Sequence, residues 1–174
     1  MSDDTPDTDP KPEAGAADAQ REAPYRIESQ YVKDFSFESP RAPEVFFNTK
    51  HAQAKIDVVI DVETRNIGPR TVEVTLLIEA KASTDEGIVY VIELAYAGAV
   101  VVGAVPREAV PPLLLIEVPR MLFPFARNMI AELTRNGSFS TLFLAPFDFL
   151  GLFEAKMARQ SEGGESAVAE VEDA

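Results

Sequence analysis

TVEVTLLIEAK, residues 71–81, alternates apolar and polar side chains with a period of two. In an extended chain such a period places the apolar set on one side and a mostly polar set on the other. The apolar set is Val72, Val74, Leu76, Ile78 and Ala80, and the opposite set is Thr71, Glu73, Thr75, Leu77 and Glu79. The pattern predicts a β-strand with one face in a core and one face in water.

Three further stretches have the same period. KIDVVIDVE (55–63) precedes the first stretch, IVYVIELAY (88–96) follows it, and residues 30–38 lie further upstream. Turn residues separate the later stretches, in Asn66-Ile67-Gly68-Pro69 and in Asp85-Glu86-Gly87. Because links this short join antiparallel neighbours, the sequence predicts a four-stranded antiparallel sheet.

The second half of the chain changes to a helical pattern. Pro119 suits the first turn of a helix, and Gly137 suits its C-terminal end. Between them, apolar residues recur at the spacing of one helix face, at Leu122, Ala126, Met129, Ile130 and Leu133. A second helix is expected to open at Pro146, with Asp148 in its first turn. These elements predict an α+β fold, in which two helices pack on one face of the sheet.

The expected second helix, residues 146–157, carries apolar residues on more than one side. They are Phe147, Phe149, Leu150, Leu152 and Phe153. A short helix beside a sheet has one face to bury, so this surplus requires further cover. Either a second subunit covers it, or the helix forms a wall of an apolar groove.

Both ends of the chain are acidic and poor in bulky apolar residues. Such segments cannot bury enough surface to offset the entropy of ordering, so we predict disordered tails at 1–24 and 158–174 around one domain at 25–157.

No basic patch followed by an apolar run opens the chain. The longest apolar run, Leu94–Val105, is shorter than the roughly 20 residues that a bilayer requires. We therefore expect a cytoplasmic protein with no stable membrane insertion.

Composition argues against several functions. The net charge is −13, with 16 Lys and Arg against 29 Asp and Glu, so nucleic acid is not an expected partner. The chain has no Cys, and its one His, His51, falls in a polar loop, so we predict neither a metal site nor a cofactor. The sequence shows no phosphate-binding loop and no catalytic constellation. A binding protein is therefore favoured over an enzyme.

Three blocks of the sequence resemble the SecB family of protein-export chaperones. YVKDFSFESPRAPEVF (31–46) resembles the N-terminal strand of that family, and LFPFAR (122–127) resembles a block of its long helix. GSFSTLFLAPFDFLGLF (137–153) resembles the block that follows this helix. The blocks occur in the family's order across residues 26–153, and they leave both tails uncovered.

The resemblance implies a homotetramer, a dimer of dimers, with the long helices packed between dimers. The interface would then include Leu122, Phe123, Arg127 and Ile130. It also implies ATP-independent binding of unfolded preproteins in apolar grooves. The matching block places the groove walls at Phe139, Leu142, Leu144, Phe149, Leu152 and Phe153.

The family delivers its clients to the SecA motor ATPase, which docks on acidic residues of the outer sheet face. By motif these residues match Asp34 and Glu38, and Glu93 matches by its place in the following strand. Family members often have Asn or Glu where this chain has Phe143 and Phe147, so this groove is expected to be more apolar than usual.

Two other functions stay open from the sequence. One is a SecB-like chaperone dedicated to a single client, such as the antitoxin of a toxin–antitoxin pair. The other is a carrier of a small apolar ligand, which would use the same groove as a monomer or a dimer.

Overall fold

The structure is a computed structural model that describes residues 23–47 and 49–169, with side chains as far as residue 159. Nearly all of the predicted N-terminal tail and the end of the predicted C-terminal tail lie outside the described residues.

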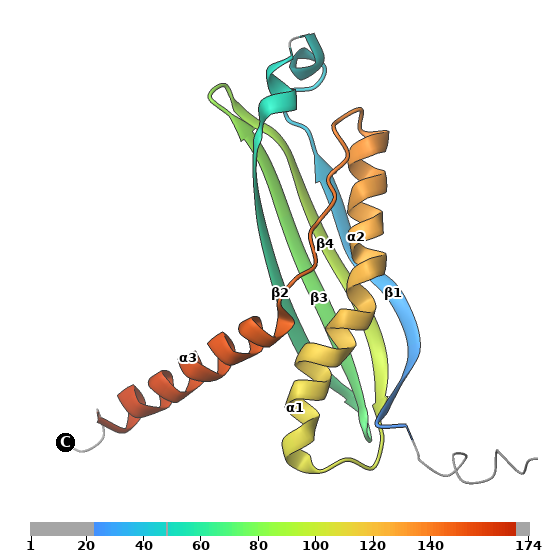
Figure 1. Cartoon of the computed structure of the whole chain (residues 1–174), viewed down its shortest axis with the longest axis vertical. Coiled ribbons are helices and arrows are strands. Elements are labelled where there is room, and N and C mark those ends of the chain that lie inside the picture. Colours follow the sequence, from blue (N-terminus) through green and yellow to red (C-terminus); the bar gives the residue numbers. More distant parts are fainter. Residues whose placement is uncertain (1–22, 48, 170–174) are drawn as a thin grey trace, which may run out of the picture.

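Four long strands form one antiparallel sheet (Figure 1). They are β1 (Tyr25–Glu38), β2 (Lys55–Gly68), β3 (Thr71–Thr84) and β4 (Gly87–Val102). Their order across the sheet is β1-β4-β3-β2, so β2, β3 and β4 form a meander and β1 joins it beside β4. The predicted sheet is confirmed, although every strand is longer than predicted.

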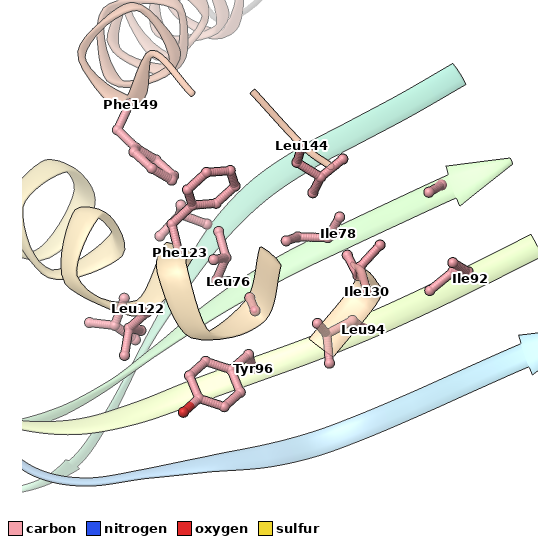
Figure 2. Packing of buried hydrophobic residues seen from close by; sticks show 14 of the residues in the cluster. Leu76, Ile78, Ile92, Leu94, Tyr96, Leu122, Phe123, Ile130, Leu144 and Phe149 are labelled. Atoms are coloured by element: carbon pink, nitrogen blue, oxygen red, sulfur yellow. The ribbon is translucent and has the colours of Figure 1, made fainter. Parts of the chain in front are cut away.

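The core lies on one face of this sheet. The apolar set predicted for β3 is buried there, together with Ile92, Leu94 and Tyr96 of β4. Figure 2 shows Leu76, Ile78, Ile92, Leu94 and Tyr96 of this face together with Leu122, Phe123 and Ile130 of the long helix. Burying a side chain of this size stabilises a fold by about 1.5–3 kcal/mol, so this layer supplies much of the stability.

One continuous helical stretch covers the core face. It begins at Arg107, passes through short turns (η3, Arg107–Ala109; α1, Val110–Pro112; η4, Leu113–Glu117, with π-helical bonding) and continues as α2 (Val118–Asn136). The helix therefore starts well before Pro119, where we expected it, because residues 110–117 are apolar enough to pack on the sheet as well. The predicted end at Gly137 is confirmed: its backbone N–H donates to the Leu133 carbonyl at 2.8 Å.

α2 lies close to β4 because Gly98 has no side chain. A Cβ atom at Gly98 would lie 3.2 Å from a methyl carbon of Leu122, which is tighter than ordinary van der Waals contact. By length and composition alone, the helix over 107–136 could cross a membrane, but 44% of its most apolar stretch is buried in the fold. Core helices of soluble proteins pass the same test.

An extended segment, residues 138–148, returns along the sheet and leads into α3 (Phe149–Ala169). α3 opens at Phe149 and not at Pro146, because Asp148 caps it: its carboxylate accepts the Gly151 N–H at 3.0 Å. The helix continues past residue 157, the expected end of the domain, since residues 154–159 all have high helix propensity.

The two helices differ in how they meet the sheet. α2 lies along the core face, whereas α3 points away from the edge of the sheet (Figure 1). α3 is held at its start, where Phe149 is buried and Lys156 binds β2. The expectation of two helices packed on one face is therefore correct for α2 and correct only for the start of α3.

Candidate binding groove and acidic surface

An apolar groove of about 330 Å³ lies between β2 and the extended segment. β2 contributes Ile56, Val58 and Ile60, which alternate on its core side, and the other wall is residues 142–147. α2 does not cover β2 here, so Ile56 and Val58 stay exposed. Among the large apolar side chains that line the groove, Phe143 is the most open, with 72% of its surface accessible.

β2 also forms one edge of the sheet. An edge strand presents backbone N–H and C=O groups that can pair with an added extended chain. An apolar groove beside such an edge can therefore hold an extended peptide by its apolar side chains and by its backbone.

The predicted groove residues divide into two groups. Leu142 and Leu144 line the groove, although the Leu144 side chain is largely buried in its floor. Phe149 is 1% exposed and packs against Phe123, so it belongs to the core (Figure 2). The other predicted residues, Phe139, Leu152 and Phe153, are not part of the groove lining.

Phe139 instead lies at the centre of an aromatic cluster at the far end of the extended segment. Its ring centroid is 5.1 Å from those of Tyr90 and Phe46, and 6.0 Å from those of Phe37 and His51. Burial raises the pKa of the Tyr90 phenol, whose hydroxyl has no hydrogen-bond partner among the described residues. The contact of His51 with aromatic rings could not be predicted from sequence, because His51 stands in a polar loop.

The β2 wall of the groove was not predicted from the sequence. Ile56, Val58 and Ile60 follow the same alternation as Val62, which is buried, and the pattern predicted one buried face for all four. Alternation identifies the apolar side of a strand, but it does not tell how far along the strand a helix extends.

Asp34, Glu38 and Glu93 share the outer face of the sheet. In the register, Asp34 pairs with Ala95, Glu38 pairs with Val91, and Glu93 pairs with Ser36. All three carboxylates are exposed. The structure thus brings together the three acidic residues that the sequence singled out.

The acidic surface extends beyond these three residues onto β2 and β3. Glu79 pairs with Glu93, and like charges directly opposite each other destabilise a sheet. A shallow hollow of about 360 Å³ lies among the carboxylates, and its lining adds Asp61 and the apolar Leu77. The surface can therefore receive a cationic segment that also carries an apolar side chain. Lys81 is a basic residue on the same face.

The outer face of the sheet also contains a buried carboxylate, that of Glu73. Glu73 is 4% exposed, and it accepts hydrogen bonds from Tyr31 and Lys33, both at 2.6 Å, and from Arg65 at 3.1 Å. The hydrogen bond from Arg65, with those from Lys33 and Tyr31, lowers the pKa of the Glu73 carboxyl from 4.5 to about 2. Glu73 is therefore ionised at neutral pH.

The predicted oligomer interface needs correction. Leu122 and Ile130 are 0% exposed and Phe123 is 6% exposed, because all three pack on the chain's own sheet (Figure 2). They are therefore not available to a second subunit. Arg127 is half-buried and donates to the Leu144 carbonyl at 3.4 Å. The large apolar side chains that α2 exposes are those of Met121 and Phe125.

Comparison with known proteins gives consistent results. The family model described as preprotein translocase subunit SecB matches residues 18–160. The protein-export protein SecB of Maricaulis maris is 46% identical over 86% of this chain and 87% of its own. That of Afipia carboxidovorans is 44% identical over 84% of this chain and 92% of its own.

A solved structure agrees in fold. The SecB-like chaperone of Mycobacterium tuberculosis, solved with a peptide from an antitoxin, superposes with a TM-score of 0.59. The match covers 72% of this chain and 92% of that chain at 14% identity, so it supports the fold alone. The three sequence blocks, the sheet with its covering helix and the match over residues 18–160 lead to one conclusion: this chain belongs to the SecB family.

Proposed function

We propose that this chain is a non-enzymatic export chaperone, which binds unfolded preproteins without ATP and keeps them competent for translocation. Family membership gives the function class, and the apolar groove between β2 and residues 142–147 is the observation that carries the proposal. Folded proteins bury their apolar side chains, so an open apolar groove selects chains that have not folded.

The test of this activity is a refolding experiment. A slow-folding preprotein is diluted from denaturant into buffer with the purified chain and no nucleotide. We expect stoichiometric arrest of both refolding and aggregation, and no effect on a client that has already folded. Refolding at an unchanged rate in excess chaperone would contradict the proposal.

We further propose that the acidic surface is the docking site for SecA, with Asp34, Glu38 and Glu93 as the main contacts. A flat face with like charges side by side suits a basic partner. Asp34→Lys and Glu38→Lys should each abolish most of the SecA binding and leave refolding arrest unchanged. Retained SecA affinity in both variants would contradict this assignment.

The assembly is also a proposal. We infer that the chain works in the cytoplasm as a homotetramer, a dimer of dimers, with the exposed face of α2 between dimers. Met121 and Phe125 are both more than half exposed, and large apolar side chains in that position favour a partner surface. Analytical ultracentrifugation of Phe125→Glu should show smaller particles than the parent chain, whereas an unchanged tetramer would exclude this face.

The identity of the relatives favours a general export role over a dedicated client. The relatives at 44–46% identity are named protein-export proteins, and the antitoxin-bound chaperone is 14% identical. Refolding arrest of several unrelated preproteins would support the general role.

A further inference from the structure

β1 contains an extra residue, Lys33, directly before Asp34. Val32 pairs with Tyr96 and Asp34 pairs with Ala95, which are consecutive on β4, so Lys33 has no partner of its own in the register. Such a bulge shifts the alternation of side chains by one residue. Without the shift, Asp34 and Glu38 would lie on the same face as Val32, which is the core face. The acidic surface on β1 therefore depends on this bulge.

The side chain of the extra residue is bound to Glu73. The Lys33 Nζ atom is 2.6 Å from Glu73 Oε1, across β4 on the third strand of the sheet. β4 has small residues at this level, Ala97 and Ala99, and they leave room for the side chains to meet. Glu73 is itself fixed, because Tyr31 of β1 donates to its other oxygen and Arg65 of β2 donates to both.

We propose that Glu73, acting through Lys33, holds the β1 bulge that turns Asp34 and Glu38 outward, and is therefore a positioning residue for the docking of a cationic partner. The inference rests on the proposed function of the acidic surface. Glu73 does not touch the partner in this account. It is buried and already bound to two cationic side chains, while the contacts are made by Asp34 and its neighbours.

Lys33→Met separates this account from a simple effect of charge. Removal of a positive charge beside the surface makes the surface more negative, which by itself would strengthen the binding of a cationic partner. Loss of the salt bridge between Lys33 and Glu73, in contrast, releases the bulge and weakens the binding of the partner. We expect the affinity for SecA to fall about fivefold, with refolding arrest unchanged. SecA affinity equal to or higher than that of the parent chain would overturn the proposal.

Two further variants sharpen the result. Lys33→Arg keeps a cation that can reach Glu73, so it should retain the parent affinity for SecA. Glu28→Gln removes one negative charge from β1 at its other irregularity, between Ile27 and Ser29, without touching Lys33. Its effect should be less than about twofold. A loss in Glu28→Gln as large as that in Lys33→Met would also overturn the proposal.

Glu73→Gln removes the carboxylate of the same salt bridge, and it should weaken SecA binding as Lys33→Met does. If this variant does not fold, the comparison of Lys33→Met with Lys33→Arg decides the question. The Lys33 side chain is 44% exposed, so it tolerates substitution. Asp34→Lys, measured in the same assay, separates the proposed docking site from the proposed positioning role of Glu73. If it retains SecA affinity, the docking assignment fails. If it loses affinity while Lys33→Met does not, only the positioning role fails.

Discussion

The two faces of the sheet come from the same four strands, but they are completed in different ways. On the core face, Leu76 of β3 and Leu122 and Ile130 of α2 belong to one hydrophobic cluster, and all three are fully buried. On the outer face, Glu79 and Glu93 lie side by side in the open. The core face is thus arranged for the stability of the chain. The outer face keeps an arrangement that costs stability, which is expected where a partner supplies the missing charge.

The largest effect is expected on the core face. Ile130→Ala removes a wholly buried side chain between α2 and the sheet, so it should lower the free energy of unfolding by about 3 kcal/mol. Urea denaturation measures this change. Val59→Ala is the matched control on the outer face, where the side chain is mostly exposed, and it should change the free energy by less than about 0.5 kcal/mol.

The next effect concerns Glu73, the buried carboxylate of the outer face. Its pKa is about 2 in the fold against an ordinary 4.5, so its contribution to stability is complete above pH 4.5 and is lost as the pH falls toward 2. Glu73→Gln should destabilise the chain by about 2 kcal/mol at pH 7 and make the loss of stability below pH 4.5 less steep. Urea midpoints at several pH values test both. Equal slopes in the two proteins would contradict this role.

A third substitution tests the apolar groove, where α2 leaves the core face of the sheet uncovered. Phe143→Ser removes a mostly exposed ring from the groove wall, so it should leave the unfolding midpoint unchanged. In the proposed binding groove this ring becomes buried when a client binds, so the affinity for an unfolded preprotein should fall about tenfold. Leu150→Ser is the control, since Leu150 is an exposed apolar residue outside the groove lining. Similar losses of affinity in both variants would place client binding elsewhere.

The smallest effect is expected where α3 is attached. Lys156 binds the Asp61 carboxylate at 2.6 Å and the Val62 carbonyl at 2.7 Å, and so fixes α3 to β2. Lys156→Met should cost less than about 1 kcal/mol, because the pair is partly exposed. Hydrogen exchange should become faster at the start of α3 and stay unchanged in β3. If Asp61→Asn and Lys156→Met have additive effects, the two side chains do not act as a pair.

The strands could be predicted from sequence where polar and apolar residues alternate, as in Val72 to Ala80. The prediction stopped early in β4, at Tyr96, although the strand runs to Val102. There the Glu73 cluster covers the outer face while α2 covers the other, so small and apolar residues such as Ala97 and Gly98 occur on both sides. Alternation disappears when both faces are buried.

The acidic residues could be identified from the sequence by resemblance, and the register brings them together. The groove could be predicted only in part. Its β2 wall depends on where α2 stops covering the sheet, and the position of Phe149 depends on the cap at Asp148. Both depend on how distant segments pack together, and such information is not contained in local patterns.

The strand order β1-β4-β3-β2 also has a consequence for synthesis of the chain. β1 is the first strand to leave the ribosome, but its neighbour β4 is the last strand to be made. Glu38 must wait for Val91, and Tyr25 must wait for Val102. A growing chain that ends before residue 87 can pair β2 with β3, but it lacks Glu93 and cannot place β1. In ribosome-bound chains of increasing length, crosslinking to SecA should therefore begin only after β4 has emerged. Until then, an unfinished chain lacks the complete acidic surface that we propose as the docking site.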